Sequence, residues 1–175
     1  MLRDAEEVMG RIQRVAGVEY TVLVPNLRGA ERALESRADE LNLVMSVSET
    51  HNLANLRMPR EHSFTALTEV IKRVDGQTPI NVSLSCAFGC PMEGEVTQQE
   101  VLQWAQRLAD LGVRGLTICD TTGMANPAQV SRLVEALQAK LTQQLTLHFH
   151  NTRGMGLANV LAAVQVVLSV LTVRW

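Results

Sequence analysis

Aromatic residues and net charge are both scarce in this sequence of 175 residues. Phenylalanine, tryptophan and tyrosine together make up 3% of the chain, so the core must be built mainly from Leu, Val, Ala and Met. The formal net charge is −2, and no basic patch is interleaved with aromatic residues. Nucleic acid is therefore not an expected partner, because its recognition needs concentrated positive charge and stacking surfaces.

Cysteine occurs only three times, at Cys86, Cys90 and Cys119, each in apolar surroundings. An odd number of cysteines in such surroundings argues against a disulfide framework and favours reduced thiols. The spacing of Cys86 and Cys90 is not that of a Cys-x-x-Cys redox motif, and two cysteines are too few to form a zinc site alone. We expect them to pack structurally in a cytoplasmic protein.

From the sequence we expect neither a signal peptide nor a membrane span. Met1–Glu7 is acidic and has no apolar stretch. Met155–Val173 carries no charge and approaches the length of a membrane span. It contains polar residues, however, and it follows a strand and a turn. We interpret it as a buried helix that runs into a buried strand, and we expect no contact with a membrane.

Apolar runs alternate with amphipathic segments along most of the chain. Strands, the first of them short and buried, are predicted at Tyr20–Val24, Leu41–Val47, Pro79–Ser85, Gly115–Cys119 and Leu145–His150. Helices are predicted at Arg3–Arg14, Arg28–Arg37, Ser63–Val74, Thr97–Ala109 and Asn126–Lys140. Asn26, Thr97 and Asn126 are placed to cap helices. This alternation predicts βαβ units, a parallel sheet and right-handed crossovers.

Two α/β architectures fit this order, an open doubly wound sheet and a (β/α)8 barrel. No Gly-x-Gly-x-x-Gly follows the first predicted strand, which argues against the dinucleotide-binding form of the open sheet. A complete barrel needs about 250 residues. Five or six units in 175 residues therefore favour a barrel with pieces absent. We predict one α/β domain, residues 1–175, in the form of an incomplete (β/α)8 TIM barrel.

Polar residues follow each predicted strand. They include Asn26, Ser48, Glu49, Ser85, Asp120, Thr121, His148 and His150. In a barrel the C-terminal ends of all strands open onto one face, where barrel enzymes place their catalytic groups. Surface loops are polar in any protein. For Asn26 or Ser48 taken alone, ordinary loop polarity explains the residue as well as a catalytic face does.

His148 and His150 form the most specific pattern among these residues. On a strand, alternate side chains point to the same face, so the two imidazoles could share one metal ion while Phe149 packs elsewhere. A hydrogen-bonded pair of core or rim histidines is the alternative. Two imidazoles make an incomplete site, because such ions normally need a carboxylate and further oxygen ligands. Asp120 could be that ligand, an acid–base group or a residue that orients a histidine.

Arg153 and the turn Gly154–Gly156 open the helix that follows the fifth predicted strand. Backbone N–H groups at the start of a helix suit a carboxylate or a phosphate. A plain tight turn fits the same residues equally well, so the sequence leaves both readings open.

Four segments resemble the family of hydroxymethylglutaryl-CoA lyase, whose metal-dependent barrel enzymes also include isopropylmalate and homocitrate synthases. The segments are Val24–Gly29, Ser85–Gly94, Asp120–Gly123 and His148–Asn159. The His-x-His motif with the downstream Gly-x-x-x-Ala-Asn is shared with the synthases. Pro-Asn-Leu-Arg-Gly and Cys-Ala-Phe-Gly-Cys-Pro-x-Glu-Gly are similar to the lyase in particular. The resemblance extends over nearly the whole chain, to about Gln165.

The resemblance implies an acyl-CoA substrate and a Mg²⁺ or Mn²⁺ ion. The implied reaction is retro-Claisen cleavage of 3-hydroxy-3-methylglutaryl-CoA to acetoacetate and acetyl-CoA, as in leucine catabolism, triggered by abstraction of the hydroxyl proton. His148 and His150 match the two metal-binding histidines of the family, and Asp120 matches an acidic residue of its catalysis. Asn151 stands where relatives often have Asp. Candidate substrate-binding residues at the strand ends are Asn26, Ser48, Glu49, Thr121 and Arg153.

Two motifs of the family have no counterpart in this sequence. One is a strand ending in Arg-Asp-Gly, to which Arg3-Asp4 is not equivalent, and the other is a Gly-Gly-Cys-Pro loop with a catalytic cysteine. Val167–Trp175 keeps only the apolarity of a partial seventh strand. We therefore expect weak or no lyase activity from the isolated chain, and association of copies through two open parallel edges. A Claisen-type synthase relative and an inactive fragment are the alternative readings.

Overall fold

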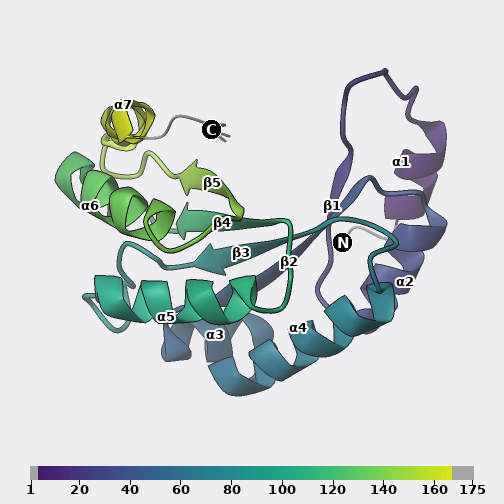
Figure 1. Ribbon diagram of the computed structural model, residues 1–175, viewed down its shortest axis with the longest axis horizontal. Coiled ribbons are helices and arrows are strands. Elements are labelled where there is room, and N and C mark those ends of the chain that lie inside the picture. The colour runs from purple at the N-terminus through teal and green to yellow at the C-terminus, as the bar shows by residue number, and fades with distance from the viewer. Residues whose placement is uncertain (1–3, 167–175) are drawn as a thin grey trace.

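The computed structural model describes residues 4–166 and contains one parallel sheet (Figure 1). Its strands are β1 Thr21–Leu23, β2 Glu40–Ser46, β3 Ile80–Ser85, β4 Gly115–Asp120 and β5 Gln144–Phe149. They pair in chain order, β1-β2-β3-β4-β5. A doubly wound sheet would reverse its order part-way, whereas a barrel adds each strand beside the preceding one. The prediction of an incomplete α/β barrel is thus confirmed.

Helices connect the strands. Those described are α1 Ala5–Arg11, α2 Leu27–Glu35, α3 Glu49–Leu56, α4 Arg60–Val74, α5 Gln98–Ala109, α6 Pro127–Gln138 and α7 Gly156–Val166. Figure 1 shows α4, α5 and α6 along the outer side of the sheet, with α1 and the loop before β1 standing away from it. Within residues 4–166, no helix is long and apolar enough to cross a membrane.

The side chains of the sheet divide between two faces. The face toward the helices carries the core, whose strand residues Leu41, Leu43, Met45, Val82, Leu84, Leu116, Ile118 and Leu147 are each at most 1% exposed. The residues that alternate with them are mostly polar and include Asn42, Asn81, Ser83, Thr117 and Thr146. In a barrel this second face would turn toward the barrel axis.

Hydrogen bonds between neighbouring strands organise the polar face. Asn81 Nδ2 donates to Asn42 Oδ1 on β2 and to Thr117 Oγ1 on β4, each at 2.8 Å. Ser83 Oγ donates to the same Asn42 oxygen at 3.0 Å. Asn81, Ser83 and Thr117 are buried and Asn42 is half-buried, and these groups satisfy one another across three strands, so the polar face is built as one connected network.

Three predicted helix caps are confirmed. The side chain of Asn26 accepts a hydrogen bond from Gly29 N at 2.9 Å, which begins α2. Thr97 Oγ1 accepts from Glu100 N at 3.2 Å at the start of α5. The side chain of Asn126 accepts from Gln129 N at 3.0 Å and begins α6. Each cap satisfies a backbone N–H that has no partner inside its helix.

The prediction of a buried strand at Tyr20–Val24 was wrong in its burial. The observed β1 is shorter, its first and last residues are exposed, and Leu23 is 59% exposed. β1 lies at the end of the strand order and pairs only with β2 among the described strands. The apolar run formed a strand, but burial depends on what packs over it.

Three expectations for the helices were also inaccurate. The first helix is Ala5–Arg11 rather than Arg3–Arg14, because Ile12 is already extended, and none of its residues is buried. The segment after β2, expected to be a polar connection, contains α3. Ser48 accepts from His51 N to begin α3, and Arg57 ends it in a left-handed conformation. The helix predicted from Ser63 begins earlier, directly after Pro59. Part of Met155–Val173 forms α7, and the strand predicted after it lies outside the described residues.

Candidate active site at the carboxyl ends of the strands

The predicted site residues lie along one edge of the sheet. All five strands are parallel, so the loops after β1 to β5 emerge at the same edge. Ser48 follows β2, Asp120 ends β4, and His148 and His150 lie at the end of β5. The barrel-like order therefore brings together residues that are far apart in the sequence.

His148 and His150 face one another, as their spacing predicted. Their rings are stacked, with centroids 4.9 Å apart and an angle of 12° between the ring planes. The Nε2 atoms lie 3.1 Å apart. Phe149 between them points to the opposite face, where it is 2% exposed and packs against Phe88 with ring centroids 5.9 Å apart. The packed aromatic pair anchors the strand end that carries both histidines.

The nitrogen pair fits part of a metal site. Two nitrogen ligands that each lie about 2.1 Å from one ion, at right angles to one another, are about 3.0 Å apart. The observed 3.1 Å separation of the Nε2 atoms is close to this value, and it is equally a hydrogen-bond distance, so the alternative of a hydrogen-bonded histidine pair fits it as well. Within residues 4–166, however, no group of three or more His, Cys, Asp and Glu side chains converges on one point. The pair can supply two ligands, and further oxygen ligands would have to complete the site.

Asp120 is oriented differently from the histidines. In the register of β4 and β5, Cys119 lies opposite His148 and Asp120 lies opposite Phe149. Residues paired across neighbouring strands point to the same face, so Asp120 leaves the sheet on the Phe149 side. The structure therefore does not bring its carboxylate to the histidine nitrogens as a third ligand.

The carboxylate of Asp120 holds the loop that follows β4. Oδ1 accepts from Met124 N at 2.8 Å, Oδ2 accepts from Ala125 N at 3.2 Å, and the residue is 1% exposed. Burial raises the pKa of Asp120, although the two amides and the nearby His150 act in the opposite direction. The net upward shift brings the pKa of this carboxyl group closer to neutral pH. Its catalytic role stays a prediction.

The candidate substrate residues near β1 and β2 are engaged in local structure. Asn26 caps α2, as described above. Ser48 Oγ accepts from His51 N at 3.0 Å and donates to Cys90 Sγ at 3.1 Å. Glu49 Oε2 accepts from both the backbone and the side-chain Nε of Arg60, each at 3.0 Å. These local hydrogen bonds are by themselves a sufficient reason for polar residues at these strand ends.

The remaining two candidates differ in their surroundings. Thr121 Oγ1 accepts from Cys86 N at 2.8 Å, which ties the loop after β4 to the loop after β3. Arg153 is exposed in the turn before α7. The first amide of that helix, Gly156 N, already donates to Asn151 Oδ1 at 2.9 Å. The Gly156 amide is thus already used within the turn, as a plain tight turn requires. The side chain of Arg153 is exposed.

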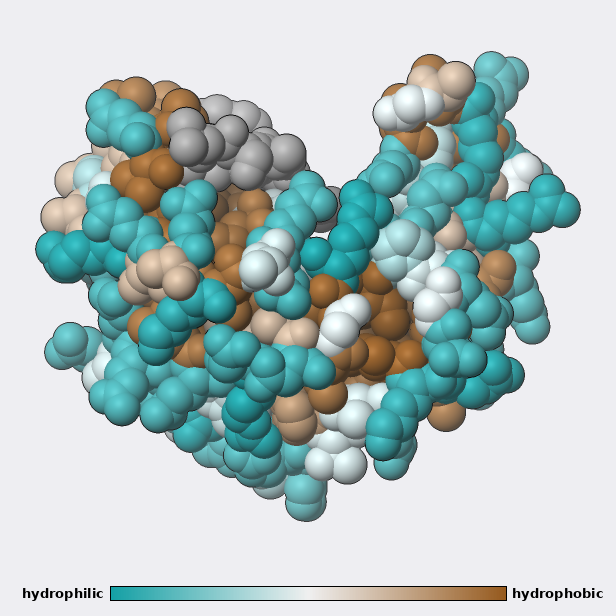
Figure 2. Space-filling model, in the orientation of Figure 1, coloured by the Kyte–Doolittle hydropathy of each residue, from teal (hydrophilic) through white to brown (hydrophobic). Residues whose placement is uncertain are grey.

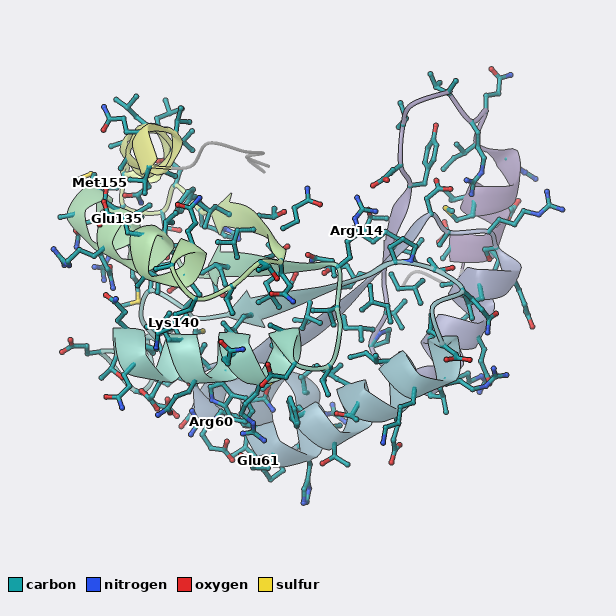
Figure 3. The ribbon with its side chains drawn as sticks, in the orientation of Figure 1. Arg60, Glu61, Arg114, Glu135, Lys140 and Met155 are labelled. Carbon is teal, nitrogen blue, oxygen red and sulfur yellow. The ribbon has the colours of Figure 1, made fainter. Side chains whose placement is uncertain are left out.

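Sequence reasoning missed the polar face itself. Asn42, Asn81, Ser83, Thr117, Thr146 and His148 border a hollow of ≈ 330 Å³, which we call the inner hollow. Arg114 lies at its other end and forms ion pairs with Glu19 at 2.8 Å and Glu40 at 3.6 Å (Figure 3). Figure 2 shows the molecule hollowed between the part that holds α6 and α7 and the part that holds α1. The strict alternation of Ile80-Asn-Val-Ser-Leu-Ser85 was the signal that could have revealed this face.

The comparison with known proteins identifies the family. The sequence profile described as HMGL-like matches residues 2–173. The chain belongs to the HMGL-like family. Among relatives of this HMGL-like chain, hydroxymethylglutaryl-CoA lyase YngG of Bacillus subtilis is 42% identical over 171 residues, which are 97% of this chain and 57% of that protein. The cytoplasmic 3-hydroxy-3-methylglutaryl-CoA lyase of Homo sapiens is 34% identical and is covered to 46%. The chain spans about half the length of these relatives.

Solved structures agree with the HMGL-like assignment. An HMG-CoA lyase from Acinetobacter baumannii, in complex with coenzyme A and 3-methylmalate, superposes with a TM-score of 0.91 at 50% identity. The match covers 94% of this chain and 54% of that one. The carboxyl transferase domain of Rhizobium etli pyruvate carboxylase, at 18% identity and a TM-score of 0.64, shares the fold alone.

Proposed function

We propose that this HMGL-like chain, as one partial barrel domain, carries part of the active site of a carbon–carbon lyase. The reaction is retro-Claisen cleavage of 3-hydroxy-3-methylglutaryl-CoA to acetoacetate and acetyl-CoA, a step of leucine catabolism. The observation that supports it most directly is the 3.1 Å approach of two imidazole Nε2 atoms at the carboxyl edge of a barrel-like sheet. Relatives that are named hydroxymethylglutaryl-CoA lyases match nearly the whole chain.

In this proposal His148 and His150 hold a Mg²⁺ or Mn²⁺ ion. When bound, such an ion stabilises negative charge that develops on substrate oxygen. Both imidazoles must be neutral and carry their hydrogen on Nδ1, so that both Nε2 lone pairs face the ion. Packing of Phe149 against Phe88 fixes the strand end from which both rings project.

Asp120 is the proposed acid–base residue. Its burial and raised pKa support this role, because a group that exchanges protons nearer neutral pH is more effective. Its carboxylate must release at least one of the Met124 and Ala125 amides before it reaches a substrate hydroxyl. Movement of the loop after β4 is therefore part of the proposal.

The proposed partner is an acyl-CoA, and the proposed location is the cytoplasm. The HMG-CoA lyase from Acinetobacter baumannii supports the first, since it forms a complex with coenzyme A and 3-methylmalate. Asn26, Ser48, Glu49, Thr121 and Arg153 are the proposed substrate contacts. Arg153 is exposed and could meet an anionic substrate group without rearrangement, whereas the other four would exchange local hydrogen bonds for substrate ones.

A chimera tests the proposed reaction. Residues 4–166 replace the matching part of the Bacillus subtilis lyase, and acetoacetate release is measured with added Mg²⁺. We expect release by the chimera, and a rate at least about 100-fold lower after His148→Ala, because the charge stabilisation at stake is several kcal/mol. His62→Ala is the matched control, since His62 is exposed on α4.

Two results would decide against the lyase. One is a chimera that folds by circular dichroism and binds Mn²⁺ but releases no acetoacetate. The other is a chimera that condenses acetyl-CoA with a 2-oxo acid, which is the outcome expected of a Claisen-type synthase.

A further inference from the structure

The loop after β4 is held from two sides, although the proposed reaction uses only Asp120. On one side the Asp120 carboxylate accepts from the amides of Met124 and Ala125, as described above. On the other side Asn159 of α7 donates from Nδ2 to Ala125 O at 3.1 Å. Ala125 is 2% exposed, so both of its bonds are shielded from water. We call the bonds of Ala125 to Asp120 and to Asn159 the Ala125 clamp.

A second contact joins the same parts of the molecule. Gly123 has a φ of 69°, and a Cβ atom at this position would lie 2.8 Å from both the backbone nitrogen and the Cβ of Thr152. Unbonded carbon atoms pack at about 3.5–4.0 Å, so a side chain does not fit here unless one loop is displaced. The loop after β4 therefore rests directly on the loop between β5 and α7.

The side chain of Asn159 is used incompletely in this arrangement. It is 0% exposed, and its Oδ1 is buried without a hydrogen-bond partner among residues 4–166. A buried polar atom that is left unpaired lowers stability, so stability alone is a poor reason for an asparagine at this position. The unpaired oxygen belongs to the same amide group that holds Ala125 O. It is therefore available as an acceptor when an amide of this loop leaves Asp120.

We propose that Asn159 is a positioning residue that controls when the loop after β4 releases Asp120. In the resting protein its Nδ2 keeps Ala125 against the Asp120 carboxylate. In the released state its Oδ1 accepts the amide that Asp120 has given up. Asn159 acts through the loop and does not touch the reacting atoms. This inference rests on the proposed lyase reaction, in which Asp120 must give up at least one amide before it reaches the substrate.

Hydrogen exchange followed by NMR tests the Ala125 clamp in the unmodified chain of 175 residues. If the clamp opens in one event, the side-chain amide of Asn159 and the backbone amides of Met124 and Ala125 should have protection factors within about twofold of one another. Protection factors of Asn159 and Ala125 that differ by about tenfold or more would show that the two bonds open separately. That result would overturn the proposal.

Asn159→Leu removes the donor and keeps a side chain of similar size. It should speed exchange of the Met124 and Ala125 amides at least about fivefold, because one buried hydrogen bond is lost. Exchange in β5 and in the rest of α7 should change far less. Ala163→Gly is the matched control, since it weakens the same helix at another fully buried position and removes no hydrogen bond of a side chain. Equal acceleration of the loop in both variants would contradict the clamp.

The kinetic consequence is measured in the chimera with the Bacillus subtilis lyase. Asn159→Leu should lower kcat about tenfold and change KM by less than about twofold, because it misplaces the Asp120 loop but removes no proposed substrate contact. Ala163→Gly should retain most of the kcat.

Two kinetic results have different meanings. An unchanged kcat in Asn159→Leu, with faster exchange in the loop, would overturn the positioning role. A chimera that releases no acetoacetate would instead contradict the proposed lyase reaction, whereas the exchange measurements would still support or overturn the Ala125 clamp.

Discussion

The two ends of the described sheet, β1 and β5, are both formed by short apolar runs but are held in different ways. β5 pairs with β4 over six residues, and Leu145, Leu147 and Phe149 are each at most 8% exposed. β1 pairs with β2 over three residues, and Leu23 is mostly exposed. Burial under helices, rather than strand pairing alone, therefore makes one end of the sheet a rigid support for functional residues.

The two ends of the sheet also differ in the kind of contact that holds them. The arm formed by residues 4–23 is attached largely through exposed charged contacts, such as Arg14 with Asp39, Arg32 with Glu6 and Arg114 with Glu19. Exposed ion pairs of this kind contribute little to stability. The histidine pair instead stands on a strand end fixed by aromatic packing. Variants at the two ends of the sheet test this difference.

The largest contrast is expected from one leucine at each end. Leu147→Ala leaves a cavity under the helices and should lower the free energy of unfolding by about 2–5 kcal/mol. Leu23→Ala removes an exposed side chain and should change it by less than about 0.5 kcal/mol. Urea unfolding followed by circular dichroism measures both. Equal losses at the two positions would show that β1 is as firmly packed as β5.

The second contrast concerns Mn²⁺ binding. His148→Ala removes one of two converging nitrogens and should raise the Mn²⁺ dissociation constant at least about tenfold, since loss of a residue that merely orients a ligand already costs that much. Titration followed by the electron paramagnetic resonance signal of free Mn²⁺ provides the measurement, and His62→Ala on α4 is the control. Binding that is unchanged in His148→Ala would remove the histidine pair from the metal site.

The third contrast concerns association at the β1 edge. An unpaired strand edge invites pairing with another chain, and a lysine on that edge opposes it. We expect the wild-type protein to be larger than a monomer in light scattering after size exclusion. The Leu23→Lys variant should instead have the monomer mass of 19.3 kDa. Thr65→Lys, on an exposed position of α4, adds the same charge elsewhere and should leave the larger species intact. If both variants elute like the wild type, association does not use β1.

The smallest effect is expected from an ion pair of the arm. Arg14→Ala removes the contact with Asp39 at 3.0 Å and the stacking of the guanidinium on Tyr20. The cost should be about 0.2–1 kcal/mol and should shrink as salt is added. Chemical unfolding at two salt concentrations measures it. A loss above this range that is insensitive to salt would indicate a packed arm.

Much of the fold followed from the alternation of apolar runs and amphipathic segments. All five strands were located to within about two residues, because the residues that face the helices form strong local signals. α3 was missed, since its stability depends on tertiary contacts. Asn52 is fully buried, accepts from Ser46 N at 2.9 Å and donates to Met58 O at 2.8 Å. A helix that is held in place by a buried polar side chain lacks the apolar periodicity from which helices are predicted.

The site was predictable only where the geometry is local. The shared face of His148 and His150 follows from strand alternation within one element. The orientation of Asp120 depends on the register of β4 against β5, which no short sequence pattern reveals. The same holds for the inner hollow, because the partners Asn42, Asn81 and Thr117 come from three different strands.

The strand order has a consequence for the way in which this chain acquires its structure. Each strand from β2 to β5 pairs with the strand that precedes it in the sequence, so every new unit can dock on one already formed. No strand among the five described has to wait for a partner from the distant end of the chain. Pairing between consecutive strands keeps the sequence separation of contacts lower than pairing with distant strands would, and lower contact order speeds folding. It also suits a polypeptide that emerges progressively from the ribosome. The sheet can therefore grow outward from its earliest strands while synthesis continues.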